Sequence, residues 1–545
     1  MPRIVSRRLG SALLPALLLF SCGDDRGEVS PAPETPVRGG TFVMALSGDP
    51  GHLNPAISTM GVTHEASELI FNGLVAMDRD LNPIPELASS WTIEEDGALY
   101  RFTLTDGVTW HDGVAFTSRD VKFTFEELLL KFHGRTRASI RPNLAGIDTP
   151  DERTVVFRFR QPYAPLLYQL DVTEAPILPS HLYAGSEPER NPANLRPIGT
   201  GPFKFGSFNQ NSDLTLVRNP GYFKPGLPYL DTVKMRIIPD AAARIFALQK
   251  GEVDWIHERE GFGADTASLE RDPNLDVLRS PWTPGGANCV MTISFNLDRP
   301  VFSDLRVRRA IYHAVDRRRF FDDILFGQGA VADSPISAGI RWAHVPNLPV
   351  PAFDPRESER LLDTAGWKRG SGAARTAQSV PGVPDGTRLK IDFLHFPAFA
   401  RYGELFRQQL AVVGIDVEQR PLDPTVFPTP VFRDRDFDTN LIRYCHGTDP
   451  EVGVRRMFHS TEIGPTAFTN AAGYRNGGVD SLFDSASRTV DQRRRAELYR
   501  EIQDIVVKDL PYVWIVETVG SWAHTTRCTG FQVHTGLFLE SAFCR

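Results

Sequence analysis

The sequence predicts a mixed α/β protein of several domains. Its 545 residues exceed what one hydrophobic core usually supports, and about 150 residues per domain gives three or four domains. Residues 389–394, 402–413 and 415–419 form a strand–helix–strand pattern of the kind that builds a parallel sheet. Residues 87–125 instead read as an antiparallel meander that leads into a helix. We therefore expect an α/β protein that also carries an α+β part.

The first residues have the pattern of an export signal. Three arginines within the first eight residues precede an apolar run over 9–20 that is too short to span a membrane. The run ends in Leu-Phe-Ser-Cys, which is similar to a bacterial lipobox, whose cysteine becomes the lipidated first residue. We thus expect a lipoprotein signal peptide over 1–21, lipidation at Cys22 and a disordered tether over 22–38. The alternative is an ordinary cleaved signal peptide that leaves Cys22 free.

Composition excludes several classes of function. Without residues 1–21 the chain has 57 basic and 67 acidic residues, so its net charge is −10 and it is a poor nucleic-acid binder. A Gly-rich turn at 199–203 lacks the Lys-Ser/Thr of a phosphate loop, and its spacing fits neither nucleotide fingerprint. We expect no nucleic acid partner, no cofactor and no resident metal.

The meander is the most readable part of the chain. Tyr100, Phe102 and Leu104 alternate with the other residues of 99–105, which predicts a half-buried strand there between Asp-Gly turns. Thr117 lies three residues before Asp120 at the start of an apolar periodic stretch, which predicts a capped helix.

The remaining elements follow the same patterns of alternation and helical periodicity. A run of arginines near 306–319 lies about one helical turn apart beside aspartates, which favours a salt-bridged helix face over a nucleic-acid patch. A Gly-, Ser- and Pro-rich stretch at 368–388 predicts a surface loop. Further strands are predicted at 39–44, 154–159, 253–255, 293–296, 437–445 and 512–516, and further helices at 53–74, 242–248, 301–317, 359–367 and 493–510.

Several motifs occur in a fixed order: A-x-x-W, D-G-x-x-Y-x-F-x-L, G-V-x-W-H-D-G and F-T-x-x-D-V within 87–125, and F-x-D-x-R-V-R-x-A at 302–310. This order resembles family 5 of the extracellular solute-binding proteins, the oligopeptide, dipeptide and nickel receptors of ABC importers. The resemblance implies a periplasmic binding protein-like class II fold, with two hinged lobes and an extra inserted α+β domain. The implied parts are lobe I (39–74, 197–286 and 518–545), the inserted domain (75–196) and lobe II (287–517).

Four cysteines remain after Cys22. An even number in an exported protein indicates disulfides, with three possible pairings, and the lack of C-x-x-C argues against a redox site or structural zinc. The resemblance implies that Cys289 pairs with Cys445, which leaves Cys528 with Cys544.

The resemblance also places the ligand site at the end of the strand over 437–445. Asp449 could meet a ligand amine or simply form an Asp-Pro turn, and Arg443 could bind a carboxylate or balance surface charge. His446 as a nickel ligand is the weaker reading, because a lone histidine is usually structural.

Further candidate residues are expected to line the cleft. Tyr444 and Trp282 could form apolar walls, although both are equally ordinary as core aromatics. Residues near Gly61 to His64, which include Thr63, should face the cleft or else form a solvated loop.

The resemblance and the export signal together imply a monomeric, membrane-anchored lipoprotein on the periplasmic or envelope side of the cell. It would capture a small solute, most readily short peptides, by hinge closure and deliver it to ABC permease subunits. A nickel complex or another small solute is the alternative ligand. An exported hydrolase is the alternative class, although G-x-S-x-G and H-E-x-x-H motifs do not occur, and a sensor or chaperone on the same scaffold is a third.

Overall fold

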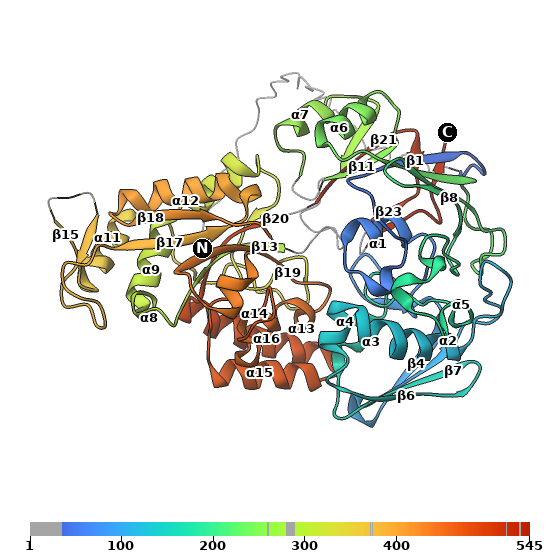
Figure 1. Cartoon of the computed structure of the whole chain (residues 1–545), viewed down its shortest axis with the longest axis horizontal. Coiled ribbons are helices and arrows are strands. Elements are labelled where there is room, and N and C mark those ends of the chain that lie inside the picture. The colour runs from blue at the N-terminus through green and yellow to red at the C-terminus, as the bar shows by residue number, and fades with distance from the viewer. Residues whose placement is uncertain are drawn as a thin grey trace, which may run out of the picture. The chain divides into compact units, whose positions relative to one another are not determined.

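The computed structural model describes residues 35–258, 261–278, 289–370, 372, 374–424, 426–518, 520–533 and 536–545. Residues 37–545 form one compact unit, and two large sheets and one smaller sheet carry most of its strands (Figure 1). The predicted signal peptide, Cys22 and Trp282 lie outside the described residues. Among the residues described, no helix is both long and apolar enough to cross a membrane.

The first lobe is built on a seven-stranded sheet whose strands come from distant parts of the chain. Central strand β1 (Thr41–Leu46) pairs in parallel with β10 (Thr232–Ile237) and β11 (Trp255–Glu258), and Phe42, Met44 and Leu46 are buried. A C-terminal pair of short strands, β22 (Cys528–Thr529) and β25 (Phe543–Cys544), lies beside β1 (Figure 1). In spatial order the strands are β12 (Leu275–Leu278), β21 (Ser521–Thr525), β11 (Trp255–Glu258), β1 (Thr41–Leu46), β10 (Thr232–Ile237), β9 (Asp213–Arg218) and β8 (Phe203–Asn209).

The second lobe is built on a six-stranded sheet. Strands β17 and β18 are parallel and are joined by α12 (Ala400–Val412), which confirms the predicted strand–helix–strand unit. All seven residues of β13 are buried, because both neighbouring strands and the surrounding helices cover it. In spatial order the strands are β14 (Ala330–Val331), β20 (Tyr512–Thr518), β13 (Cys289–Phe295), β19 (Thr439–Cys445), β17 (Lys390–His395) and β18 (Asp416–Pro421).

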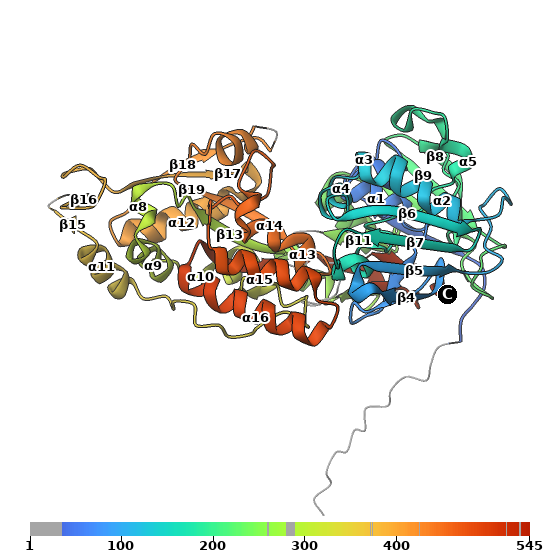
Figure 2. The same ribbon diagram turned by 90° about the horizontal axis from the view of Figure 1, so that it is seen from below.

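The meander forms a separate four-stranded sheet, β4 (Ala88–Glu94), β5 (Leu99–Leu104), β7 (Thr154–Phe159) and β6 (Leu144–Asp151). Tyr100, Phe102 and Leu104 are buried on β5 as predicted. Helix α2 (Ser118–Phe123) packs against β6 and β7 (Figure 2), and Thr117 and Asp120 form the expected capping box. Most buried side chains of this sheet belong to the same hydrophobic cluster as Phe42, Met44 and Leu46 of β1 and the buried residues of β9 and β10.

Helices cover the sheets of both lobes. The predicted salt-bridged face lies on α9 and the turn after it, where Arg306 pairs with Asp304 and Arg318 with Asp322. The remaining helices and strands are α1 (Gly61–Ser67), α3 (Leu130–Phe132), α4 (Gly134–Ser139), α5 (Ser180–Tyr183), α6 (Ala241–Gln249), α7 (Thr266–Leu269), α8 (Pro300–Ser303), α9 (Leu305–Ala314), α10 (Arg317–Arg319), α11 (Pro355–Thr364), α13 (Pro450–Gly453), α14 (Arg455–Phe458), α15 (Gly477–Arg488), α16 (Gln492–Asp509), β2 (Val75–Met77), β3 (Pro83–Pro85), β15 (Trp367–Arg369), β16 (Arg375–Ala377), β23 (Gln532–Val533) and β24 (Leu537–Phe538).

Two predictions of local structure were wrong. The helix predicted over 53–74 is divided into a short 3-10 turn (Pro55–Ile57), which the Asn54 side chain caps, and helix α1, with Ser58 extended between them. The loop predicted at 368–388 contributes to a hairpin of β15 and β16. Arg375 fixes this hairpin because it is almost fully buried and donates hydrogen bonds to Asp363 and to the carbonyl of Trp367.

Candidate functional site

A cavity of about 250 Å³ lies where strands of both large sheets approach each other. Strands β1, β11 and β21 of the first lobe line it together with helix α1, the short strands β23 and β24, and Gly536. Strand β19 contributes from the second lobe, and Arg135 contributes from α4. The cavity is therefore assembled from segments of both lobes and of the region that contains the four-stranded sheet.

Helix α1 presents one face to this cavity. Gly61, His64, Glu65 and Glu68 lie three or four residues apart, so the helical repeat places them on the same side. Glu65 Oε1 lies 3.2 Å from His257 Nδ1, which links α1 to β11. Thr63 lies off this face, where it is buried and donates a hydrogen bond to the carbonyl of Pro50 at 3.2 Å.

Four rings form a layer on one face of β11 and β21. Trp255 lies opposite His524, and His257 lies opposite Trp522, in the antiparallel register of these strands. Each pair is stacked, with ring centroids 6.0 Å apart in the first pair and 5.2 Å in the second. Trp255, His257 and Trp522 line the cavity, so this layer gives it a flat aromatic wall.

Strand β19 sends alternate side chains to opposite sides. Arg443 and Cys445 line the cavity, whereas Tyr444 is completely buried in the core of the second lobe. The Tyr444 hydroxyl donates to the carbonyl of Thr469 at 2.7 Å. The structure thus places the predicted Arg443 at the cavity and gives Tyr444 the alternative, core position.

The predicted residues beyond β19 take internal positions. Asp449 has no exposed surface, accepts two hydrogen bonds from Arg495 at 2.7 and 2.9 Å, and caps helix α13. His446 is also fully buried, and its Nδ1 accepts a hydrogen bond from the backbone N–H of Ser337. Burial lowers the pKa of His446 to about 3, so this imidazole is neutral. Neither residue lines the cavity described above.

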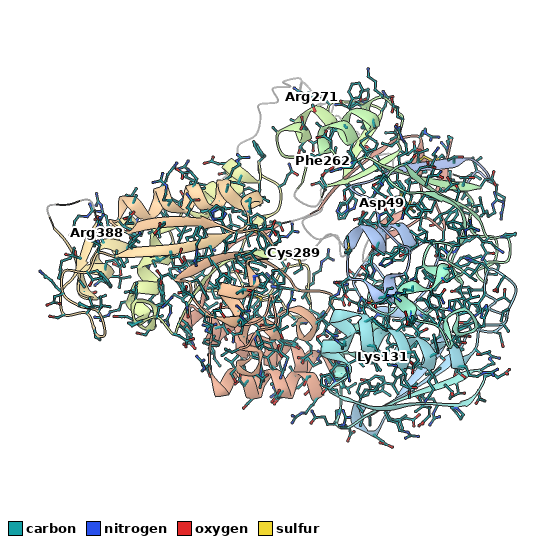
Figure 3. All side chains as sticks on the ribbon, viewed as in Figure 1. Asp49, Lys131, Phe262, Arg271, Cys289 and Arg388 are labelled. Carbon is teal, nitrogen blue, oxygen red and sulfur yellow. A yellow bond between two sulfur atoms is a disulfide. The ribbon has the colours of Figure 1, made fainter. Side chains whose placement is uncertain are left out.

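Both predicted cysteine pairs lie within disulfide distance. Cys289 and Cys445 face each other in the register of β13 and β19, and Cys528 and Cys544 do so in β22 and β25. The first pair, whose Cys289 is labelled in Figure 3, adjoins the cavity because Cys445 lines it.

The charges around the cavity have both signs. Glu65 and Glu68 supply carboxylates, and Arg135 and Arg443 supply guanidinium groups. Arg135 is itself held by Glu174, with Nε and Oε2 3.1 Å apart. A solute that carries separated positive and negative groups would find a complement to each of them in this cavity.

Two α/β lobes with a polar, aromatic-walled cavity between their strands define a two-lobed solute-binding protein of class II. A family model for the middle region of bacterial extracellular solute-binding proteins, family 5, matches residues 82–465. The chain belongs to this family.

Named relatives extend the comparison. The chain is 27% identical over 544 residues to the oligopeptide-binding protein AppA of Bacillus subtilis, covering 96% of this chain and 95% of that one. It is 26% identical over 509 residues to the glutathione-binding protein GsiB of Salmonella typhi, covering 92% and 94%. The solved structure of B. subtilis AppA with a nonapeptide matches with a TM-score of 0.74 and 25% identity, covering 94% of this chain and all of that one.

Several cavity residues were missed by the sequence analysis. Trp255, His257 and Trp522 lie on strands whose mutual pairing no local pattern reveals. Arg135 belongs to the short helix α4 and carries no motif. Glu65 offered a signal, because it directly follows the predicted His64 and precedes Glu68 by three residues on the same helical face.

Proposed function

We propose that this protein is the substrate-binding component of an ABC importer and that its solute is a short peptide. The observation that carries the proposal is the cavity with carboxylates on α1 and guanidinium groups on α4 and β19. A free peptide has an ammonium group and a carboxylate at its two ends. Glu65 and Glu68 would receive the first, and Arg135 and Arg443 the second, through charge-assisted hydrogen bonds.

The aromatic wall and the relatives support the same ligand class. Trp255 and Trp522 present flat apolar surfaces that can contact peptide side chains of different shape, so they favour no particular peptide sequence. Two relatives that align along most of the chain are named for oligopeptide and glutathione binding. A peptide is therefore the ligand class that both the charges and the relatives favour.

The cellular setting forms the second part of the proposal. The chain would be a monomeric, non-enzymatic lipoprotein, anchored through lipid on Cys22 outside the cytoplasmic membrane, that delivers its solute to permease subunits. The export pattern at the N-terminus and membership of an extracellular binding-protein family support this setting. Mass spectrometry of the protein from its native membrane would show the acylated cysteine.

Titration calorimetry tests the ligand. Purified protein from residue 23 onward is titrated with pools of free peptides of two to nine residues, then with the same peptides acetylated at the amino end or amidated at the carboxyl end. We expect one peptide per protein and weaker binding of both blocked forms. If none of the peptides produced binding heat or raised the melting temperature, the proposal would be overturned.

A matched pair of arginine variants locates the carboxylate contact. Arg443→Gln should weaken binding of peptides with a free carboxylate by about 10- to 100-fold, because a hydrogen bond to a charged group contributes about 1.5–3 kcal/mol. The affinity for the amidated peptide, which has no free carboxylate, should fall much less in this variant. Arg360→Gln on the exposed surface of α11 removes the same charge away from the cavity and should leave affinity unchanged.

A further inference from the structure

A second group of potential ligand atoms lies in the second lobe, apart from the peptide cavity. Carboxylate oxygens of Asp333 and Glu517 and a ring nitrogen of His344 all lie within 4.8 Å of one another. Glu517 is near the end of β20, and Asp333 follows β14, which pairs with β20. His344 comes from the long connection between β14 and α11. None of the three lines the peptide cavity.

The orientation of His344 shows which of its nitrogens faces the acids. Nδ1 lies 2.8 Å from the backbone carbonyl oxygen of Ile336. A carbonyl oxygen only accepts hydrogen bonds, so the proton of the neutral ring is on Nδ1. Nε2 then directs its lone pair toward Asp333 Oδ1, 3.7 Å away. A lone pair and a carboxylate that face each other repel, and either a metal ion or a proton between them would remove this repulsion.

Each carboxylate also accepts hydrogen bonds from groups outside the cluster. Asp333 Oδ2 accepts a hydrogen bond from the backbone N–H of Asn347 at 2.8 Å. Glu517 Oε2 accepts from the hydroxyl of Ser337 at 2.8 Å and from the backbone N–H of Ala338 at 3.1 Å. Such partners behind each ligand are typical of metal centres, because they fix the orientation of the coordinating atoms.

Burial leaves one side of the cluster open. Glu517 as a whole residue is 3% exposed. The side chain of His344 is 11% exposed and that of Asp333 is 35% exposed. An ion could therefore enter past Asp333 and keep a water molecule at a remaining position. Two carboxylates would balance the charge of a divalent ion.

We propose that Asp333, His344 and Glu517 bind one divalent transition-metal ion of the zinc type. One imidazole nitrogen and two carboxylate oxygens are ligands that Zn²⁺ accepts, and Co²⁺ occupies the same kind of site. The site is independent of the peptide cavity. The competing explanation is a proton on His344 Nε2, which would form an ion pair with Asp333 and need no metal.

Metal titration distinguishes the two explanations. Untagged protein from residue 23 onward is freed of metal with a chelator and titrated with Zn²⁺ by calorimetry and with Co²⁺ by visible absorption. We expect one equivalent of each ion, a d–d band from protein-bound Co²⁺, and a higher melting temperature with Zn²⁺. No saturable binding of either ion would overturn the proposal and leave the proton as the cation.

Variants locate the ion. His344→Ala should lower Zn²⁺ affinity at least 100-fold and abolish the Co²⁺ band. His181→Ala is the matched control, because His181 contacts Asp112 at 2.8 Å and belongs to no such three-residue cluster among the described residues. Asp333→Asn, on the more exposed ligand, should weaken binding similarly and decides the question if His344→Ala fails to fold. Unchanged metal binding in folded Asp333→Asn and His344→Ala would place the ion elsewhere and overturn the assignment.

Discussion

At the scale of single residues, Asp449 shows how one motif serves two different roles. The Asp-Pro sequence fits either a ligand contact or a local cap, and the spacing alone leaves both open. In the structure the carboxylate is completely buried, caps α13 and is bound by both terminal nitrogens of Arg495. Arg495 in turn lies over the ring of Trp342, 5.0 Å from its centroid. This network fixes α13 to α16.

We expect Asp449→Asn to act on stability. Removal of one member of a buried ion pair leaves the other charge without compensation, which costs about 3–5 kcal/mol. Urea denaturation should show this loss in the free energy of unfolding, while peptide affinity of the folded protein stays the same. Glu497→Gln, at an exposed pair on α16, should change stability by less than about 1 kcal/mol. A stable Asp449→Asn that no longer binds peptide would instead support the ligand role.

The buried ring of His111 makes stability depend on pH. The pKa of His111 is lowered to about 4, chiefly by burial and in smaller part by the charge of Lys204, while the hydrogen bond to the Gly201 backbone and the charge of Asp112 raise it. Nε2 donates to the carbonyl of Gly201 and Nδ1 accepts from the N–H of Gly199, so a second ring proton would face a donor.

Because the folded pKa lies below the ordinary value near 6.5, the unfolded chain takes up the proton first as pH falls. The contribution of His111 is fully present above pH 6.5 and is lost between pH 6.5 and about 4. Its full size is about 3 kcal/mol, because each unit of difference between the folded and unfolded pKa corresponds to about 1.36 kcal/mol. Urea denaturation at several pH values should show a shallower fall over this window in His111→Gln than in the parent protein. Equal slopes in the two proteins would contradict the assignment.

At the scale of elements, patterns with strong local causes predicted the structure well. The alternation at 99–105 predicted β5, which spans Leu99–Leu104, and the Thr117–Asp120 pair predicted the start of α2. The helix predicted over 53–74 failed because local hydrogen bonds compete with a continuous helix. The Asn54 side chain accepts from the N–H of Ala56, and Ser58 Oγ accepts from that of Met60.

The cap of α2 provides a prediction at this scale. Asp120 Oδ2 accepts from the N–H of Thr117, and its Oδ1 accepts from the N–H and hydroxyl of Ser180. Asp120→Ala removes the cap and leaves these half-buried donors of Thr117 and Ser180 without their acceptor, so we expect a loss of about 2–4 kcal/mol in the free energy of unfolding. Glu126→Ala, which removes an exposed pair with Lys122 next to α2, should cost less than about 1 kcal/mol. Thermal and urea unfolding would measure both, and similar losses would contradict the role of the cap.

At the scale of the whole molecule, the motifs predicted the family and the two-lobed fold, but only part of the cavity. Helix α1 and Arg443 could be placed because they lie in or near segments that resemble the family. Trp522 could not, because it reaches the cavity only after β21 pairs with β11 from a distant part of the chain, and Arg135 could not, because it lies on the short helix α4 and belongs to no motif. The sequence also left open which side chains of β19 face the cavity. At this end of the strand, Arg443 lines the cavity and Tyr444 lies in the second lobe's core, because successive side chains point to opposite sides.

The division of the cavity between two lobes leads to a prediction about closure. A peptide bound to α1 and to Arg443 on β19 contacts both lobes, so it binds the closed arrangement more tightly and shifts the protein toward it. Small-angle scattering should show a smaller radius of gyration with saturating peptide. At a free peptide concentration of 100 times the dissociation constant, the folded state should be stabilised by about 2.7 kcal/mol, which a higher melting temperature would show. Arg443→Gln should reduce both responses at the same peptide concentration, whereas Arg360→Gln should keep them. A peptide that binds by calorimetry while the radius of gyration stays constant would disprove closure without disproving binding.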